Sequence, residues 1–281
     1  MTDEAAPYDR IAEGYRRWWG PVLVRDAVAT LDLVAADVAA GARRILDLGA
    51  GTGTLALAAV RRWPSVEVVA LDISDEMVTL AEREARSTLA PAQRRRLSTL
   101  VADAEELPYD RAAFDVVVSS FAIQLVGNRA QALREAFRVL RPGGRLAYVT
   151  WLAAEVRFAP DLALDAVLDE LQLEGRDRGD GGSPDVVSPR AAADGLRRAG
   201  FRRARATGAL LEHRFDPEAY LGFVREFDEE DLFETLPRSQ RARLEARLLA
   251  RVRALRPDDL VLRLPIVRAT GVVPGADRAS R

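Results

Sequence analysis

Short apolar runs alternate with segments of helical periodicity through the middle of the chain. We expect strands in the apolar runs, at residues 45–48, 66–73, 97–102, 114–121 and 146–151. The periodic segments between them predict helices at 54–62, 75–87 and 129–140. Because the loops that join these elements are short, their order indicates a parallel sheet with right-handed crossovers. The predicted fold class is therefore α/β, with a doubly wound sheet.

The pattern changes on both sides of this region. Helical segments precede it at 8–19 and 21–40, the second with apolar residues at 24, 28 and 31. Beyond it we expect helices at 158–173, 188–199, 217–233 and 239–255, and strands at 203–215 and 260–273. We interpret these two strands as an antiparallel pair with two helices inserted between them. Pro265 should bend the last strand or place it at an edge, because proline cannot donate to a strand ladder.

Two local signals set boundaries in the predicted sheet. Ser74 is a favourable cap for the helix at 75–87. The segment Arg-Pro-Gly-Gly-Arg at 141–145 should stop the preceding helix and reverse the chain before the next strand.

The first predicted strand ends in a turn with three alternating glycines, at 49, 51 and 53, and a helix follows at once. Glycine permits close approach of a ligand to the backbone, and the helix start offers unpaired amides to an anionic group. Asp72 ends the second strand, where a carboxylate can accept both hydroxyls of a ribose. A dinucleotide turn would have glycine in place of Thr54. The spacing thus favours a nucleoside with a small carboxylate tail, such as S-adenosylmethionine (SAM).

Composition narrows the possible functions. The 41 basic and 43 acidic residues nearly cancel, so no overall charge indicates binding to nucleic acid. Every basic residue is arginine, which excludes lysine Schiff-base chemistry, and the chain has no cysteine for disulfides or thiolate chemistry. No apolar run reaches about 18 residues, so we expect no membrane span. We see no signal peptide near Met1 and expect a cytoplasmic location.

Five motifs in order resemble those of class I SAM-dependent methyltransferases, in the small-molecule group that includes the quinone-biosynthesis C-methyltransferases. They lie at residues 46–53, 71–74 with Met77, 102–108, 114–117 and 140–146. The resemblance implies a Rossmann-like, doubly wound, seven-stranded sheet with an antiparallel last strand and helical lid insertions. It also implies transfer of a methyl group from SAM to an oxygen, nitrogen or carbon atom of an acceptor, leaving S-adenosylhomocysteine.

The resemblance assigns the methionine end of SAM to the glycine turn. Gly49, Gly51 and Gly53 would line it through their backbone, together with Ala50, and Asp47 would order the turn.

The other implied cofactor contacts follow successive strand ends, at Asp72, Ile73, Met77, Asp103, Ala104 and Ser119. Asp72 would hold the ribose, and Ile73 and Met77 would pack near the adenine. Asp103 would bond the adenine amino group and the Ala104 amide a ring nitrogen, while Ser119 would flank the sulfonium. Asp72 could instead be a capping or surface acid, and Asp103 an ordinary turn acid.

The implied organisation has four parts. Residues 1–42 would be an N-terminal helical cap, and residues 43–152 the SAM-binding core. Residues 153–273 would complete the sheet and carry lid insertions at about 155–187 and 216–257. Residues 274–281 would be a disordered tail, and the glycine-rich loop at 174–189 should be mobile.

Aromatic residues and a single histidine supply further candidates. The first helix could pack across the core, or it could cover the crevice and bring Tyr15 and Trp18 to the cofactor. His213 is the only histidine, so it is the candidate general base, with Gln124 as an alternative contact to the acceptor. We cannot assemble a set of metal ligands.

We therefore expect an apolar or aromatic small molecule as acceptor, no nucleic acid, and a monomer or homodimer. Two alternatives remain open. The chain could bind SAM as a regulatory or partner-binding protein without transfer activity, or it could be another nucleotide-cofactor enzyme on the same fold.

Overall fold

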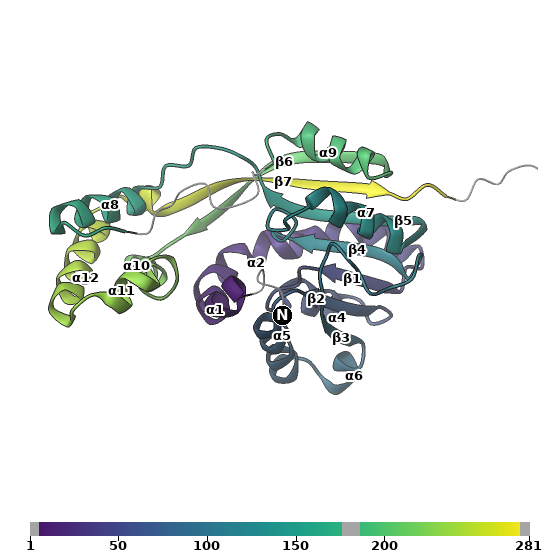
Figure 1. Cartoon of the computed structure of the whole chain (residues 1–281), viewed down its shortest axis with the longest axis horizontal. Helices are drawn as coiled ribbons and strands as arrows, with labels where there is room; N and C mark the ends of the chain where they lie inside the picture. The colour runs from purple at the N-terminus through teal and green to yellow at the C-terminus, as the bar shows by residue number, and fades with distance from the viewer. Residues whose placement is uncertain (1–5, 176–185, 276–281) are drawn as a thin grey trace, which may run out of the picture.

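Seven strands form one mixed sheet in the computed structural model, which describes residues 6–175 and 186–275 (Figure 1). The strands are β1 (Arg44–Leu48), β2 (Glu67–Asp72), β3 (Leu97–Val101), β4 (Phe114–Ser120), β5 (Leu140–Trp151), β6 (Arg202–Arg214) and β7 (Val261–Val272). Their order is β3-β2-β1-β4-β5-β7-β6. Strands β1 to β5 are parallel, whereas β7 is antiparallel to both of its neighbours. The predicted fold class is confirmed.

Helices precede, separate and follow the strands. Before β1 they are α1 (Ala6–Gly14), η1 (Tyr15–Trp19), α2 (Gly20–Ala29), η2 (Thr30–Val34) and α3 (Ala35–Ala39). Within the core they are α4 (Thr54–Arg62), α5 (Asp75–Thr88), α6 (Pro91–Arg94) and α7 (Arg129–Val139). After β5 they are α8 (Ala159–Leu171), α9 (Pro189–Arg198), α10 (Pro217–Phe223), η3 (Val224–Asp228), α11 (Glu230–Thr235), α12 (Arg238–Arg253) and η4 (Pro257–Leu260). Both η1 and η3 are π-helical.

Apolar layers cover both faces of the sheet. One layer joins α4, η2 and the β1–β2 region, with Leu31, Ile45 and Val60 fully buried. The other joins α7 and α9 to β4, β5 and β7, with Leu146 and Phe201 fully buried. The central strands are therefore buried on both sides, which explains why their sequences are continuous apolar runs. The side chain of Ser74 accepts the Met77 amide and caps α5, as predicted.

The turn predicted at 141–145 is part of β5. Helix α7 ends at Val139 and the strand begins at the next residue. The register with β4 shifts between Phe114 and Val116, so the two glycines form an irregularity inside the ladder. A Cβ on Gly144 would lie 2.9 Å from the Asp115 carbonyl oxygen. Close contact with β4 therefore replaces the separate reversal that we expected.

We expected Pro265 to bend the last strand or place it at an edge; β7 as a whole lies between β5 and β6, but at Pro265 its ladder pairing is with β6 alone. The physical reason is local. The ladder between β5 and β7 ends at Trp151 and Ile266, and the Leu152 amide still donates to the Pro265 carbonyl. In an antiparallel ladder a residue's carbonyl and amide point to the same side. The amide hydrogen that proline lacks is therefore missing where β5 ends.

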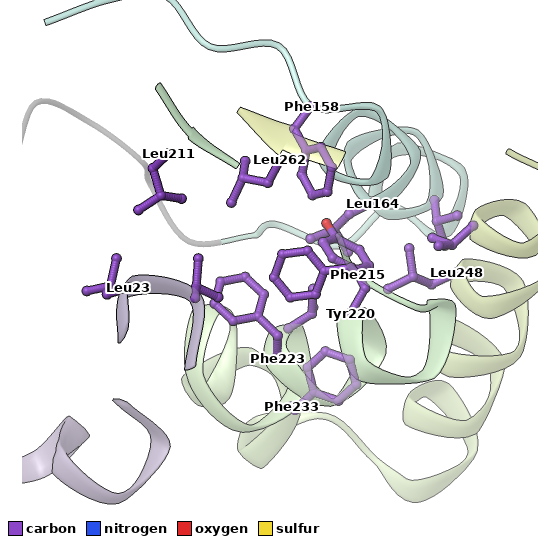
Figure 2. Packing of buried hydrophobic residues seen from close by; sticks show 14 of the residues in the cluster. Leu23, Phe158, Leu164, Leu211, Phe215, Tyr220, Phe223, Phe233, Leu248 and Leu262 are labelled. Atoms are coloured by element: carbon purple, nitrogen blue, oxygen red, sulfur yellow. The ribbon is translucent and has the colours of Figure 1, made fainter. Parts of the chain in front are cut away.

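Beyond this point β6 and β7 continue as a two-stranded ribbon toward α8 and α10–α12 (Figure 1). We call η3 and these four helices the lid. Aromatic side chains fill the space between the lid and the ribbon, and Figure 2 shows Phe158, Phe215, Tyr220 and Phe223 gathered there. The same apolar cluster includes Leu23 of α2, so the N-terminal helices are packed against the lid.

Two expectations extend beyond the described residues. The mobile loop at 174–189 includes residues 176–185, and the disordered tail at 274–281 includes residues 276–281; both of these ranges lie outside the described part. Within the described ranges, no helix has the length and apolar character needed to cross a bilayer.

Candidate functional site

The turn after β1 has three glycines with positive φ angles of 69°, 52° and 83°. The Gly49 and Ala50 amides both donate to the Leu71 carbonyl at 2.8 Å, which fixes the turn against β2. A Cβ on Gly49 would lie 2.2 Å from the Cβ of Ala122, whereas a Cβ on Gly51 would meet no atom within 4 Å. Gly49 is therefore needed for packing, and Gly51 faces open space where a ligand can approach the backbone.

Asp72, at the end of β2, holds the turn from the neighbouring strand. Its Oδ2 accepts the Gly51 amide at 2.7 Å, and its Oδ1 accepts the Ser74 amide at 3.1 Å. Burial raises the pKa of Asp72, the amide hydrogen bonds oppose that shift, and the nearby charge of Asp9 adds to it. Asp72 thus combines a structural role in the turn with a carboxylate that lines the cavity.

Asp47 does not hydrogen-bond the turn that we expected it to order. Its side chain is fully buried, and neither carboxylate oxygen has a hydrogen-bond partner among the described residues. Burial raises the pKa of Asp47 to about 8; the nearby Ala56 amide opposes this shift, and the charge of Asp72 adds to it. A buried carboxylate without a partner is costly, so this residue requires an explanation.

A cavity of about 460 Å³ opens at the carboxyl ends of the parallel strands. Most of the residues predicted for the adenosine end line it, namely Asp72, Ile73, Met77, Asp103 and Ala104. Gly49, Ala50 and Gly51 line it from the turn. Asp103 also accepts the Glu105 amide at 2.8 Å, which shapes the loop after β3. Parallel α/β sheets bind ligands at this edge.

Aromatic side chains form one wall of the cavity. Tyr15, Trp19, Phe121, Trp151 and Phe227 all line the cavity. The ring centroids of Phe121 and Trp151 are 4.4 Å apart, and those of Trp19 and Phe227 are 6.3 Å apart with nearly parallel planes. The wall therefore combines rings from the N-terminal helices, from two strand ends and from the lid.

Tyr15 lies where the aromatic wall meets the acidic side of the cavity. Burial, with the negative charges of Asp72 and Asp47, raises the pKa of Tyr15 to about 12. The phenol is therefore neutral at physiological pH and can donate a hydrogen bond, but it cannot act as a base. Its place in the cavity agrees with the prediction that a tyrosine of the first helix reaches the crevice.

Five predicted residues lie outside the cavity lining: Asp47, Gly53, Trp18, Ser119 and His213. Gly53 precedes α4. The Ser119 hydroxyl donates to the Leu48 carbonyl at 2.7 Å inside the sheet. Trp18 faces the lid and donates to Glu226. His213 packs edge-on against Phe215 in the ribbon, and burial lowers the pKa of its imidazole.

Gln124 lines the cavity, but both ends of its amide are engaged. Its Nε2 donates to the Phe121 carbonyl at 2.6 Å, and its Oε1 accepts the Thr150 hydroxyl. Phe121 has a φ of 52°, which is unusual for a bulky residue. Gln124 therefore holds a strained aromatic residue of the wall in place.

Sequence analysis missed part of the lining. Leu23 and Ala27 line the cavity together, four residues apart and in step with Trp19. That spacing was readable, but the apolar residues that we noted in this helix were those at 24, 28 and 31, and Val24 is 43% exposed. Glu105 also lines the cavity; it lies in the motif at 102–108 but was given no role. The loop at 125–127 lines the cavity as well, and no local pattern in the sequence marks it.

A more open hollow of about 720 Å³ lies beside this cavity. It is lined by residues 105–110 and by Gln131, Glu135 and Arg138, and it contains no residue of the glycine turn. Arg138 and Glu135 pair with each other there at 2.7 Å. In the described ranges, no group of three His, Asp or Glu side chains is arranged to hold a metal ion.

Comparison with known proteins identifies the core. Residues 45–144 match the methyltransferase domain family. The ubiquinone/menaquinone biosynthesis C-methyltransferase UbiE of Dinoroseobacter shibae is 38% identical over 150 residues, which cover 52% of this chain and 55% of the relative. The malonyl-[acyl-carrier protein] O-methyltransferase of Methylococcus capsulatus is 40% identical over 119 residues, 41% of each chain. The chain thus spans about half the length of the curated relatives it matches.

Solved structures extend the likeness in fold to most of the chain. The YcgJ protein from Bacillus subtilis superposes with a TM-score of 0.57, covering 88% of this chain and 99% of that protein, at 22% identity. This supports the fold alone. The two curated relatives differ in the atom that they methylate according to their names, so likeness to them does not select an acceptor.

Proposed function

We propose a methyl-transfer function for this chain, whose residues 45–144 form a class I SAM-dependent methyltransferase domain. The acceptor is an uncharged small molecule, apolar or aromatic. One observation carries the proposal. The glycine turn, Asp72 and Asp103 follow successive strands and line one cavity, which aromatic side chains also line.

Unsatisfied groups in the structure fit SAM. The Asp47 carboxylate is buried without a hydrogen-bond partner, and although it lies outside the cavity lining, the ammonium of a methionine tail bound at the glycine turn would stabilise its charge. The open space at Gly51 leaves room for that tail against the backbone. Asp72 retains acceptor capacity for the ribose hydroxyls beyond its two amide bonds. Asp103, Ala104 and Met77 line the same cavity, which supports contacts of the first two with the adenine edge and of Met77 with its face.

The charged residues that line the cavity favour an uncharged acceptor over an anionic one. Although the chain has many arginines, no arginine and no histidine of the described residues lines it. Its acids, Asp72, Asp103 and Glu105, lie on the side assigned to the cofactor. An anionic acceptor would therefore be desolvated without a cation to pair with. An uncharged aromatic molecule would instead pack against Trp19 and Trp151.

The residues that line the cavity would orient the cofactor and the acceptor and exclude water; they would not transfer protons. When bound, SAM supplies an electrophilic methyl group on a sulfonium. The acceptor's electron pair forms the new bond to this methyl carbon, the carbon–sulfur bond breaks, and its electrons remain on sulfur. Orientation alone can contribute roughly 7–11 kcal/mol to such a step. Tyr15 is neutral, Gln124 is engaged and His213 lies in the ribbon, so the acceptor's proton leaves to solvent.

This shortage of bases also favours a second candidate. Among the described residues no free base lines the aromatic wall, so the protein could bind SAM without transferring its methyl group. An assay with an acceptor that is a good nucleophile without deprotonation distinguishes a methyltransferase, which would methylate it, from a protein that only binds SAM.

The test combines binding and transfer. Calorimetry with SAM, S-adenosylhomocysteine and NAD should show binding of the first two only. Methyl-labelled SAM should then label neutral aromatic acceptors in preference to carboxylate or phosphate analogues of the same ring. NAD binding without SAM binding would refute the cofactor. Preference for the anionic analogues would refute the acceptor class, and SAM binding without labelling of any acceptor would support the second candidate.

A further inference from the structure

A single carboxylate joins the N-terminal helices to the lid. Glu226 lies in η3, and its Oε2 accepts the Trp18 Nε1 hydrogen at 2.9 Å and lies 2.8 Å from Arg17 Nη1. Its other oxygen, Oε1, accepts from Arg225 of the lid. One oxygen therefore faces η1 and the other faces the lid. We call the contact between η1 and η3 the cap–lid seam.

Glycines on both sides of the seam permit this close approach. A Cβ on Gly14 would lie 2.6 Å from the Glu226 carbonyl oxygen. A Cβ on Gly222 would lie 2.1 Å from the Trp18 ring. Each side thus lacks a side chain where the other side protrudes. Both seam segments are also π-helical, a form of helix that occurs often at functional sites.

The seam residues alternate with residues that line the cavity. Tyr15 and Trp19 flank Trp18 on η1, and Phe227 follows Glu226 on η3; all three of these aromatic residues line the cavity. The Trp19 and Phe227 rings lie nearly parallel across the seam. A change in the position of η1 relative to η3 would therefore move the aromatic wall.

The other end of the cap is attached beside the cofactor side of the cavity. Asp9 of α1 accepts the Ser74 hydroxyl at 2.5 Å and the Glu76 amide at 3.3 Å, at the start of α5. Ser74 in turn donates its amide to Asp72. The cap therefore runs from the ribose side of the cavity to the lid, as its place between α5 and α10 in Figure 1 also shows.

We propose that Glu226 is a positioning residue that ties the cap to the lid, so that closure over the cofactor and closure over the acceptor are one movement. The names of the two ligands rest on the proposed function, whereas the tie itself does not. A movement of the lid would then shift Trp18 and, through η1, Tyr15 at the cofactor side of the cavity. The two ligands would bind cooperatively, because each one stabilises the same closed position of η1.

The first test needs no ligand. Hydrogen exchange should show faster exchange in residues 15–19 of Glu226→Gln, by about tenfold if the carboxylate holds the segment closed. A glutamine cannot accept on both sides, since its amide nitrogen would face donors on one of them. Glu245→Gln is the matched control, because Glu245 is similarly exposed and also lies near Arg225, at 3.7 Å, without contacting the cap. Equal exchange in the two variants would overturn the proposal.

A second pair of variants reaches the seam through packing. Gly222→Ala should displace Trp18 and raise exchange in the same residues. Gly195→Ala is the control, since it is also a helical glycine but a Cβ there would meet its nearest atom at 3.7 Å. An unchanged η1 in Gly222→Ala would contradict the role given to the seam.

The third test measures the coupling. S-adenosylhomocysteine should slow exchange in both η1 and η3 of the unmodified protein, although η3 belongs to the lid. In Glu226→Gln, protection should be retained in η1 and lost in η3, and the ligand should bind roughly three- to tenfold more weakly. Retained protection of η3 would overturn the coupling. If the unmodified protein does not bind the ligand at all, the proposed function fails, and the ligand-free exchange still decides the tie.

Discussion

Replacing Asp47 by asparagine should stabilise the ligand-free protein and weaken its binding of SAM. The buried carboxylate has no hydrogen-bond partner, and burial raises its pKa from 3.8 to about 8. Between these two values the folded protein holds a proton that the unfolded chain has released. The contribution of Asp47 to stability therefore falls as pH rises through this window, by about 1.4 kcal/mol for each pH unit.

The loss of stability at neutral pH can be calculated from the same pH range between the two pKa values of Asp47. From pH 4 to pH 7 the loss is about 4 kcal/mol, taken as an order of magnitude. Asparagine has nearly the same shape and stays neutral, so it avoids this loss. The free energy of unfolding of Asp47→Asn should therefore match that of the unmodified protein near pH 4 and exceed it increasingly up to pH 8. Each kcal/mol would raise Tm by roughly 2–4 °C in a chain of this size.

Cofactor binding should show the opposite effect. In the proposed complex the ammonium of SAM stabilises the ionised form of Asp47, so binding near pH 7 should release a proton from this carboxyl. Affinity for SAM should rise with pH up to about 8 in the unmodified protein. In Asp47→Asn it should be lower and nearly independent of pH. Calorimetry in two buffers of different ionisation enthalpy would measure the released proton.

The control for this pair of effects is Asp115→Asn. The Asp115 carboxylate accepts the Arg43 and Arg44 amides at 2.6 and 2.8 Å and pairs with Arg141, so its replacement should destabilise the protein. Denaturant unfolding of both variants between pH 4 and pH 8 decides the matter. The reasoning is refuted if Asp47→Asn is destabilised at every pH, or if SAM affinity of the unmodified protein does not change between pH 5 and pH 8.

Four further variants test the assignments of the predicted site residues. Asp72→Ala should weaken SAM binding at least tenfold, about 1.4 kcal/mol, because it loses the ribose contact; an unchanged Kd in calorimetry would reject that role. Gly51→Ala should reduce SAM binding with only modest loss of Tm, whereas Gly49→Ala should lower Tm strongly through its clash with Ala122; equal Tm values would contradict the separation of packing from binding. His213→Gln should leave the rate of methyl transfer within about twofold, since the residue lies in the ribbon, and a loss of about a hundredfold or more would reinstate it as the general base.

The sheet and its glycine turn were predictable because their signals are local. The helix at 54–62 was predicted with the boundaries that it has, since a glycine turn precedes it and its apolar spacing is clear. The cap at Ser74 followed from one residue type at one position. The position of β7 inside the sheet was not readable in the same way. Pro265 is tolerated there only because β5 ends beside it, which is a fact of tertiary structure.

The residues of the candidate site also fall into those with a local sequence signal and those whose position depends on tertiary structure. Asp72 and Asp103 were found because each one follows a strand in a fixed order. His213 was chosen for its residue type alone, and its position in the ribbon could not be inferred from neighbouring residues. Glu226 was missed because its partners, Trp18 and Arg17, lie about 200 residues away in the chain. Contacts of this kind depend on the packing of the lid, and no periodicity in either segment records them.

The Glu226 and Asp47 carboxylates differ in how well they are stabilised in the ligand-free protein. This difference affects how the stability of the protein responds to its cofactor. Glu226 has a donor on each oxygen before any ligand arrives, so the seam is stable in the ligand-free protein. Asp47 has only the nearby Ala56 amide to offset its burial, so its raised pKa destabilises the ligand-free protein by several kcal/mol at neutral pH. A ligand at a hundred times its Kd stabilises a folded protein by about 2.7 kcal/mol, which is comparable with that cost. Thermal stabilisation by SAM should therefore be large in the unmodified protein at pH 7 and much smaller in Asp47→Asn at the same concentration, even though the variant starts from the higher Tm.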